Sequence, residues 1–417
     1  MLSEIRMHFS QDVLLTSSKK NTLYATLFIA FVDYMGVGLV YPLFAAMLFD
    51  QSAGLLSIET NADLRGLWLG ILIALMPFAQ FFSAPLWGSI SDNMGRKKPL
   101  QISIGIAMLG YLFALWGVFV SNIWLLLASR IIIGCAAGNM SIVQATLVDL
   151  SSHEEKANHF GLYSMALGVG FTLGPFFGGI LSSFGYSAPF LLALVLTGLN
   201  FLFVFFLFKE THFISAKLKL SLCSGLTSIK KAFYFREIRI VFLCSFLHNF
   251  GWSYFFEFTP VYLISQLNFT ATMLGVFYAA SGCFYALSTG LLIRPFTKFL
   301  TAEKLFFWGN LLSGITILSI PFLPISFLIW PLLFLICYFV AFVTPSSTTL
   351  VSNSISSENQ GEALGILSSV NAAALIFSPL CSGSFVGHYP SLPMHVGGFL
   401  LLITAGIFFM RLRKLFI

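Results

Sequence analysis

The sequence predicts an all-α membrane protein with twelve transmembrane helices, arranged as two six-helix pseudo-repeat bundles. Three observations predict this class: an apolar composition, long stretches without charge, and basic residues confined to alternate connections. Of the 417 residues, 58% are hydrophobic and only 9% are charged. Soluble globular chains carry about 25% charged residues, so an ordinary solvated surface is excluded.

Stretches without Asp, Glu, Lys or Arg give the first count of helices. A helix needs roughly 20 apolar residues to cross the bilayer. Three uncharged stretches are each long enough for two helices, with turn residues near their middles at 182–185, 321–324 and 387–393. We predict a helical hairpin in each, because a lipid-embedded chain must satisfy its backbone polar groups internally. The hairpins cover 160–208, 305–357 and 363–410, and the other predicted spans are 22–48, 67–89, 99–119, 122–147, 238–264 and 270–293.

The basic residues test this count independently. If both termini lie on one side, twenty of the 22 Lys and Arg residues fall in connections or helix ends on that side. The exceptions are Arg65, in the opposite loop 49–66, and Arg130, inside a helix. The positive-inside rule therefore predicts that both termini are cytoplasmic.

The longest connection on this side, residues 209–237, divides the chain into two bundles. We expect an N-terminal bundle at 1–208 and a C-terminal bundle at 238–417. Two interpretations of the lysine-containing linker remain open: a short amphipathic helix on the membrane surface, or a plain solvated segment.

The two halves share a spaced pattern of residues. Gly161, Ser164, Gly174, Pro175 and Gly179 are matched 204 positions later by Gly365, Ser368, Ser378, Pro379 and Gly383. Asp33 is likewise matched by His248, at an offset of 215 positions. Parallel six-helix repeats are a transporter architecture in which the substrate site lies between the repeats. The alternative is that small residues recur wherever membrane helices pack.

Residues 88–99, Gly-Ser-Ile-Ser-Asp-Asn-Met-Gly-Arg-Lys-Lys-Pro, connect the second and third predicted helices. The glycines permit a tight turn. Asp92 can engage Arg96 or the positive N-terminus of a neighbouring helix. This loop is similar to the signature loop of the major facilitator superfamily, and the resemblance covers nearly the whole chain.

The resemblance implies that this loop is a gate that latches the cytoplasmic side shut between transport states. Its residues are Gly88, Asp92, Gly95, Arg96 and Lys97. The alternative, a basic run that only sets topology, accounts for the lysines but not for Asp92 and the glycines.

The fifth predicted helix contains Gly161, Gly170, Gly174, Pro175, Gly178 and Gly179. Glycines at four-residue spacing form a ridge that lets a neighbouring backbone approach closely, and Pro175 bends the helix. The complete pattern resembles a motif of the superfamily's exporters that is usually absent from its importers. It therefore implies export, with import as the alternative.

Residues 33–42 look like the first helix of the twelve-helix drug:proton antiporters, the tetracycline and multidrug exporter group. Ionisable residues inside a membrane are costly and mark functional sites. We therefore interpret Asp33 and Glu257 as proton or substrate-charge sites. For Asp33, a capping or bracing role near the cytoplasmic end is the alternative.

Two further ionisable residues join this set. Arg130 is similar to the family's helix-4 arginine, which implies that it modulates the proton affinity of a nearby carboxylate; a tie to backbone carbonyls is the alternative. His248 could share in proton coupling because histidine titrates near neutrality, or it could be a packing residue. Asp149 is interpreted as an end charge.

Polar and aromatic residues complete the predicted site. Candidates for the cavity wall are Gln80, Gln144, Trp252, Tyr254 and Asn371. The two aromatic residues could equally be packing residues. The sequence has no phosphate-binding glycine-lysine loop, no zinc-type His/Cys cluster and no Ser-His-Asp arrangement. We therefore expect no enzyme activity, no cofactor and no metal.

The resemblance implies a proton-coupled antiporter that exports small lipophilic compounds by alternating access. We expect a monomer in a bacterial inner membrane, with a small-molecule substrate, protons and the lipid bilayer as partners and no nucleic acid. One alternative is a metabolite or nutrient carrier of the same superfamily, either a symporter or a dedicated exporter. Another is a receptor on this scaffold that transports nothing.

Overall fold

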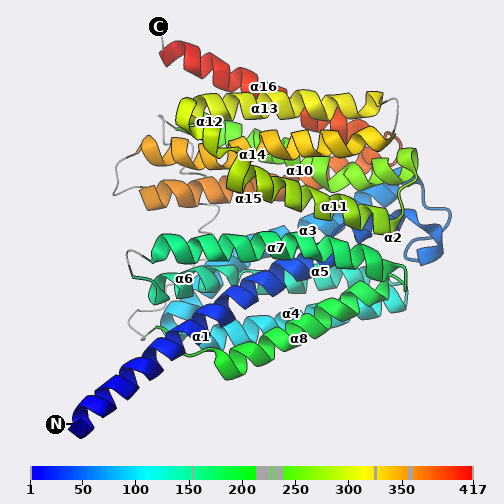
Figure 1. Cartoon of the computed structure of the whole chain (residues 1–417). Helices are drawn as coiled ribbons and strands as arrows, with labels where there is room; N and C mark the ends of the chain where they lie inside the picture. The colour runs from blue at the N-terminus through cyan, green and yellow to red at the C-terminus, as the bar shows by residue number, and fades with distance from the viewer. Residues whose placement is uncertain are drawn as a thin grey trace.

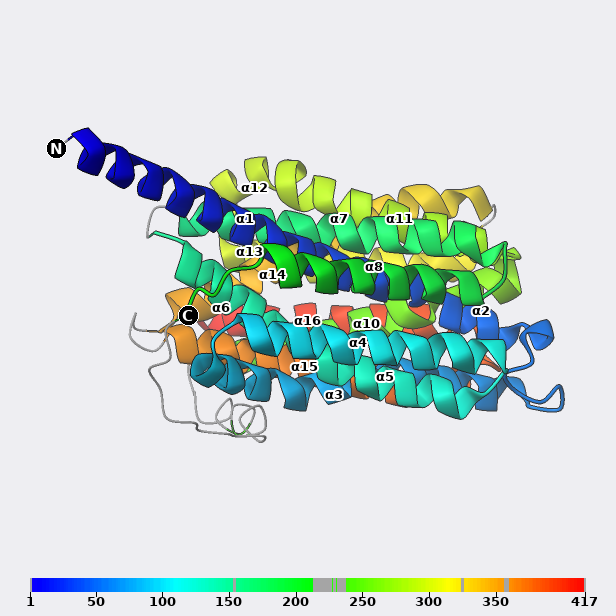
Figure 2. The same cartoon turned by 90° about the horizontal axis from the view of Figure 1, so that it is seen from below.

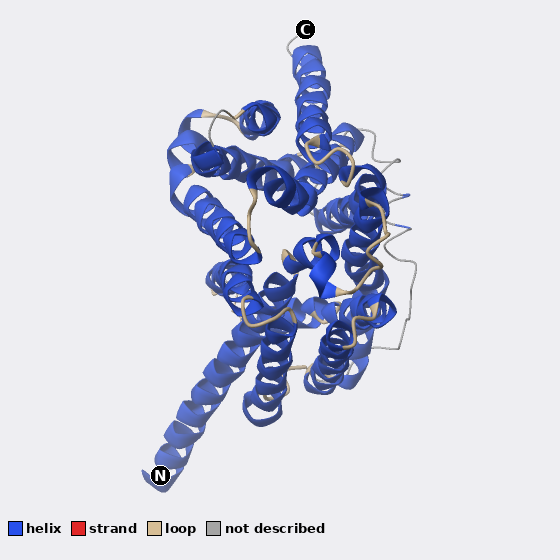
Figure 3. Cartoon of the chain, turned by 90° about the vertical axis from the view of Figure 1, so that its right-hand side faces the viewer, coloured by secondary structure: helices blue, strands red, loops and turns tan. Residues whose placement is uncertain are grey.

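The computed structural model describes residues 2–152, 155–212, 227, 230, 238–323, 326–355 and 360–415. Those residues form helices and short connections, with no strand among them (Figures 1 and 3). Eleven described segments are long and apolar enough to cross a membrane. A twelfth long helix, α10 (Arg239–Leu267), has 29 residues but is less apolar, because it carries His248, Asn249 and Glu257. The predicted all-α membrane class is confirmed.

The helices follow the predicted spans. The first half contains α1 (Leu2–Val40), α2 (Leu43–Phe49), η1 (Gln51–Ala53), α3 (Ala62–Met94), α4 (Lys97–Phe119), α5 (Ile123–Ala137), α6 (Met140–Leu150), α7 (Lys156–Ser182) and α8 (Ser187–Leu207). The second half contains α10, α11 (Ala271–Leu287), η2 (Ser288–Leu292), α12 (Arg294–Phe299), α13 (Ala302–Ser319), η3 (Ile320–Phe322), η4 (Ser326–Leu328), α14 (Ile329–Asn353), α15 (Gln360–Val386) and α16 (Leu392–Leu415). Most of the predicted linker 209–237 lies outside the described residues, so both interpretations of it stay predictions.

The three predicted hairpins turn where the sequence indicated. The first turn separates α7 from α8 and contains Gly185, whose φ of +112° is a conformation that favours glycine. The third separates α15 from α16. The repeat is also visible in the fold, because α7 and α15 each contain 27 residues and an internal proline, Pro175 or Pro379.

Two spans predicted as continuous helices are interrupted. The span 22–48 breaks between α1 and α2, where Pro42 supplies no backbone N–H. The span 122–147 breaks between α5 and α6 at Gly138 and Asn139. A Cβ added at Gly138 would lie 2.5 Å from Ser83 Oγ, so the break coincides with a close approach of α3.

The eighth predicted span, 270–293, changes its winding near its end. After α11 the chain forms the π-helical turn η2 and continues into α12. The Ile293 N–H donates to the Ser288 carbonyl oxygen at 2.9 Å, five residues back. Such turns insert one extra residue into a helix and are frequent at functional sites.

Different helix pairs hold each half together and join the two halves. In the first half α1 packs against α7 and α8, and α5 packs against α3 and α4. In the second half α10 packs against α15 and α16, and α13 packs against α14 and α16. Two pairs of long helices join the halves, α3 with α15 and α7 with α11, and Figure 2 shows both pairs side by side. The short helix α2 also packs against α10 and α11 of the second half.

The two ends of the molecule differ. The first and last described residues lie at the same end of the helices (Figure 1), which we call the terminal side; the opposite end is the far side. The halves meet at the far side: a Cβ added at Gly383 would lie 2.5 Å from the Gly66 carbonyl oxygen, and one at Gly179 would lie 2.8 Å from Gly275 Cα. At the terminal side a Cβ at Gly161 or Gly365 would have no neighbouring atom within 4 Å.

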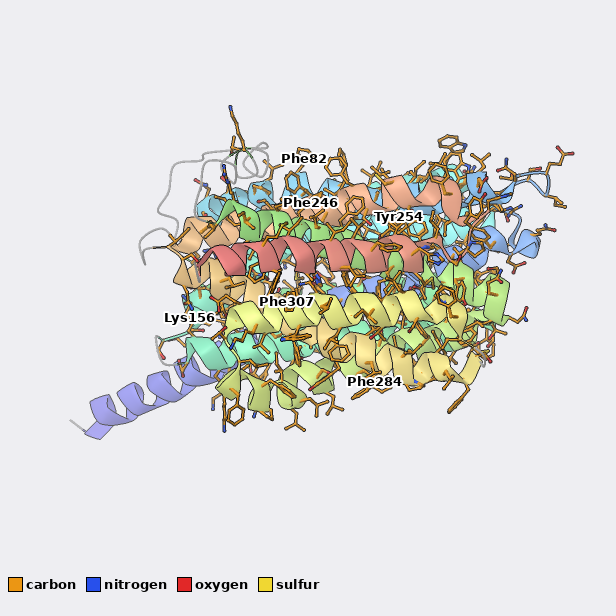
Figure 4. The ribbon with its side chains drawn as sticks, turned by 90° about the horizontal axis from the view of Figure 1, so that it is seen from above. Phe82, Lys156, Phe246, Tyr254, Phe284 and Phe307 are labelled. Atoms are coloured by element: carbon orange, nitrogen blue, oxygen red, sulfur yellow. The ribbon has the colours of Figure 1, made fainter. Side chains whose placement is uncertain are left out.

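The outer surface of the bundle is apolar. Figure 4 shows Phe82 and Phe284 at its edges, whereas Lys156 lies at the terminal side. Other aromatic side chains are strongly exposed, such as Phe206 at 72%. Soluble proteins rarely expose large continuous apolar surfaces, so this surface fits contact with lipid.

Candidate functional site

The main candidate site is a cavity of about 570 Å³ between the two halves. Its polar and aromatic lining includes Tyr34, Tyr41, Gln80, Arg130 and Phe171 from the first half and His248, Asn249, Trp252, Phe256, Glu257 and Tyr285 from the second. A smaller cavity of about 170 Å³ lies within the first half and is lined by Asp33, Tyr111 and Asn139, among others. The two cavities share Tyr34, Gln80 and Phe171 as lining residues.

Glu257 lies on the wall of the main cavity. Its side chain is 7% exposed, and its Oε2 has no hydrogen-bond partner among the described residues. Tyr41, in the turn between α1 and α2, and Ser253 of α10 lie beside the carboxyl. An unpaired carboxylate buried in a membrane is costly, so this oxygen is available to a proton or to a cationic group.

Asp33 lies in the smaller cavity, partly buried on α1. The amide of Asn139, at the break between α5 and α6, lies beside its carboxyl. Tyr34 and Tyr111 line the same cavity. The structure thus places the two predicted acids in two neighbouring cavities rather than in one.

The glycine ridge of α7 sets the position of α1 and therefore of Asp33. A Cβ at Gly170 would lie 2.5 Å from the Phe31 carbonyl oxygen, and one at Gly174 would lie 2.6 Å from the Met35 carbonyl oxygen. Gly178 makes an equally close approach to Leu39. Only glycine permits these approaches, as the four-residue spacing predicted. The other predicted glycines of this helix differ: Gly179 faces α11, and Gly161 faces open space.

Arg130 is 2% exposed and lines the main cavity. Its Nε donates to the Leu72 carbonyl oxygen at 3.2 Å, its Nη2 lies 3.1 Å from Met76 Sδ, and its guanidinium lies 4.9 Å from the centre of the Phe44 ring. It forms no ion pair within the described part of the chain. These contacts tie α5 to α3, while the cation remains beside the cavity.

His248 is part of a buried polar pair. Its Nδ1 lies 2.8 Å from Asn310 Oδ1, and the Asn310 amide nitrogen donates to the Phe306 carbonyl oxygen at 2.8 Å. Asn310 Oδ1 is therefore the acceptor, and Nδ1 of His248 carries the proton. Asn371 forms a similar pair, because its Oδ1 accepts from Asn249 Nδ2 at 3.1 Å.

The remaining cavity candidates divide into two groups. Gln80 lines both cavities and donates to the Ala137 carbonyl oxygen at 3.2 Å, and Trp252 lines the main cavity with its ring stacked on Phe256. Gln144, Tyr254 and Asn371 are not among the lining residues of either cavity. Gln144 instead donates to the Tyr163 hydroxyl at 3.2 Å. Tyr254, which is labelled in Figure 4, packs between Phe250 and Phe258. Their helices turn these side chains away from the cavity, which sequence alone does not reveal.

At the terminal side the predicted gate residues form a charge cluster. Arg96 Nη1 donates to Asp92 Oδ1 at 2.6 Å, and Arg96 Nε donates to Asp149 Oδ2 at 2.9 Å. Asp149 is therefore more than the end charge that we expected. The remaining predicted gate residues surround this cluster: Gly95 turns the chain at a φ of +81°, Gly88 lies on α3, and the Lys97 Nζ donates to the Phe205 carbonyl oxygen at 2.9 Å.

Glu210 belongs to this cluster but was not predicted. Its carboxylate accepts from the backbone N–H groups of Arg96 and Lys97 at 2.6 and 3.1 Å. Burial alone would raise the pKa of Glu210, but the backbone N–H groups of Arg96, Lys97, His212 and Thr211 outweigh it and lower that pKa. The available signal was an acid two positions after the uncharged stretch that ends at residue 208.

Within the described residues no group of three or more His, Cys, Asp or Glu side chains could hold a metal ion.

The fold and the site define a class of polytopic helical protein with a central cavity between two repeats, and comparison with known proteins identifies it. The sequence profile of the Major Facilitator Superfamily matches residues 26–302 and 241–415. The chain belongs to this superfamily of membrane transporters.

Among the relatives, the chain is 27% identical over 361 residues to the class C tetracycline resistance protein of Escherichia coli, with 86% of this chain and 88% of the relative covered. It is 26% identical over 382 residues to the quinolone resistance protein NorA of Staphylococcus aureus (strain COL), with 90% and 92% covered.

Three solved structures share the fold. The human organic anion transporter MFSD10 (TETRAN) matches with a TM-score of 0.68 at 20% identity, over 94% of this chain and 99% of that one. A bacterial homolog of the human lysosomal transporter Spinster, inward-facing and unoccupied, matches with a TM-score of 0.73 at 14% identity, over 94% and 96%. A D-xylose-proton symporter matches with a TM-score of 0.71 at 16% identity, over 94% and 97%.

Proposed function

We propose that this protein is a proton-coupled antiporter that exports small lipophilic compounds from the cytoplasm across a bacterial inner membrane. The observation that carries the proposal is a central cavity whose wall contains a buried carboxyl, Glu257, with one oxygen that has no hydrogen-bond partner among the described residues, beside aromatic walls. The relatives that confer resistance to tetracycline and to quinolones support the substrate class.

The proposed topology assigns each end of the molecule to one side of the membrane. If the terminal side is cytoplasmic, as the positive-inside rule predicts, the far-side contacts close the outer face while the halves stand apart toward the cytoplasm. Lipophilic compounds would enter the cavity from the cytoplasm or the inner leaflet. The rings of Trp252, Phe256 and Phe171 offer apolar contact, and Glu257 offers an acceptor.

Proton exchange follows from competition at the acids. A substrate entering from the cytoplasm binds while Glu257 is deprotonated, and a proton arriving from outside neutralises the carboxyl and favours substrate release. Asp33, in the adjacent cavity, provides a second proton site that the substrate does not need to touch. Arg130 contributes a fixed positive charge to the same region.

Proton movement in inverted membrane vesicles tests this function. Vesicles with the overproduced protein are acidified inside, and tetracycline, a quinolone and a lipophilic cation are added in turn. We expect proton release from the lumen with at least one compound, lost in Glu257→Gln and Asp33→Asn. Release that persists when both acids are neutralised would contradict the mechanism.

A nutrient or metabolite carrier is the second candidate. The observation that favours it is the polar wall formed by His248 and Asn249 of α10, which suits a hydroxylated or nitrogen-rich solute. In that case no drug would release protons, and a pH gradient directed inward would drive metabolite uptake into whole cells.

A further inference from the structure

Helix α10 presents two neighbouring rows of side chains to the main cavity. Residues four positions apart lie on the same face of a helix. The row that we call the oxygen row contains Asn249, Ser253 and Glu257, and the row that we call the aromatic row contains His248, Trp252 and Phe256. All of these residues line the cavity. The ends of the oxygen row lie about 12 Å apart along the helix axis.

The oxygen row offers hydrogen-bond acceptors that the protein leaves unused. Both N–H groups of the Asn249 amide are engaged, because Nδ2 donates to the Ser245 carbonyl oxygen at 2.8 Å and to Asn371 Oδ1 at 3.1 Å. Its Oδ1 is therefore left as an acceptor on the cavity wall. Glu257 Oε2 and Ser253 Oγ also have no hydrogen-bond partner among the described residues.

His248 adds a second acceptor at the Asn249 end. Its Nδ1 donates to Asn310 Oδ1 on α13, at 2.8 Å. A neutral imidazole has one donor nitrogen and one acceptor nitrogen, so Nε2 is the acceptor. No described group is paired with Nε2, and no described residue of α13 lines the cavity, to which His248 contributes. The cavity wall thus has two neutral acceptors at one end and a carboxyl at the other.

The aromatic row supplies a flat apolar surface between these ends. The ring centroids of Trp252 and Phe256 lie 5.1 Å apart with 22° between their planes. Phe171 of α7 continues the stack from the other half, with its centroid 6.4 Å from that of Phe256. Aromatic rings favour offset stacking against other flat apolar groups. The wall therefore fits a planar body that lies along α10.

We propose that this wall selects flat apolar compounds with a cationic amine at one end and a neutral N–H or O–H donor at the other. The amine pairs with the Glu257 carboxylate, and the neutral donor binds at Asn249 and His248, about 12 Å away. A compound without the second donor removes water from these acceptors without replacing its hydrogen bonds. Such a compound is rejected because unpaired buried polar groups are costly.

This inference deepens the proposed function, on which it rests, and equilibrium binding to the purified protein tests it. The probes are 6-(aminoalkyl)-2-naphthols of increasing chain length and their O-methyl ethers, which lack the second donor. We expect each naphthol of suitable length to bind about tenfold more tightly than its ether. The affinity should be greatest when the amine nitrogen and the hydroxyl oxygen lie about 12 Å apart. Equal affinities for naphthol and ether would overturn the proposal without any variant.

Variants locate the two ends of the bound compound. Asn249→Ala should lower the naphthol-to-ether ratio to below about threefold, and adding His248→Phe should bring it to about one. Asn371→Ala is the matched control, because it breaks the same Asn249–Asn371 hydrogen bond but keeps the Asn249 oxygen, and it should keep the ratio. Glu257→Gln should weaken both ligands about tenfold and leave the ratio unchanged.

Two outcomes separate this inference from the proposed function. A ratio that survives in the double variant of Asn249 and His248 would overturn the inference alone, even if drugs release protons from vesicles. The expected ratios without substrate-driven proton release would instead count against the proposed antiport and leave the recognition of two donors standing.

Discussion

The far side and the terminal side of this molecule hold the chain together by different means. At the far side the halves meet through backbone, where α3 crosses α15 and α7 crosses α11 with glycines at the contacts. At the terminal side the described contacts are ionic and lie within the first half, around Arg96. Backbone contacts depend on shape and tolerate no added atoms, whereas ionic contacts depend on charge and are weakened by partial exposure. The two ends should therefore respond to different substitutions.

The largest expected effect is at the far-side crossing of α3 and α15. Gly383→Leu places a side chain against the Gly66 carbonyl oxygen, 2.5 Å from a Cβ. Overpacking of this kind costs about 1–3 kcal/mol, so we expect the far side to open and transport to fall by about 5- to 150-fold. Labelling of a cysteine introduced near the crossing would report the opening.

Gly105→Leu is the control for this substitution. Gly105 lies within α4, and a Cβ there would have no neighbouring atom within 4 Å. We expect labelling and transport to remain close to those of the wild type. Equal damage from both variants would mean that glycine flexibility, rather than the crossing, matters.

The next effect is expected at the terminal-side cluster. Asp149→Asn removes a charge that accepts from Arg96 Nε at 2.9 Å. Hydrogen bonds to charged groups contribute about 1.5–3 kcal/mol, and Asp149 is partly exposed, so we expect about a tenfold fall in transport rate without opening of the far side. The same cysteine-labelling assay separates this result from that of Gly383→Leu.

Glu210 should give a smaller effect that depends on pH. Its lowered pKa means that its carboxylate stabilises the fold at neutral pH, and that this contribution is lost as the pH falls through the lowered value. We expect Glu210→Gln to lower the Tm by about 2 °C at pH 7. Melting curves at successively lower pH should converge for variant and wild type; a constant difference would contradict the assignment.

The smallest effect is expected at the repeat counterpart of the terminal cluster. Arg294 lies 202 positions after Asp92, at the same offset as Gly290 after Gly88 and Lys298 after Arg96, and it has no ion partner among the described residues. Arg294→Gln should therefore leave transport within about twofold of wild type, against a clear loss for Arg96→Gln. Equal losses would show that both turns act as gates.

The sequence predicted the helices better than their interruptions. Apolar runs and basic connections gave the class, the number of spans and the three hairpin turns. The break at Pro42 was not predictable, because prolines also lie inside continuous helices, such as Pro77 and Pro85 in α3 and Pro260 in α10. Whether proline breaks a membrane helix depends on neighbours that supply hydrogen bonds.

The sequence predicted which residue types form the site, but not the direction in which each side chain points. Costly residues such as Glu257 and Arg130 were identifiable because lipid disfavours them. Their neighbours were not: Tyr41 and Asn139 are ordinary in sequence and gain their positions from helix breaks. For Tyr254 the sequence left a cavity role and a packing role open, and the structure packs it between Phe250 and Phe258, because the rotation of a helix about its axis is decided by packing with its neighbours.

The closed far side has an electrical consequence. Because the closest backbone approaches between the halves, among the described residues, lie there, most of the membrane's electric field should fall across the few helical turns around Gly66, Gly383, Gly179 and Gly275. Moving one elementary charge through the full field is worth about 2.3 kcal/mol per 100 mV. A charge at Glu257 therefore crosses the potential drop when the halves change conformation, and not when a substrate or proton enters the cavity. Membrane voltage should act on the conformational step.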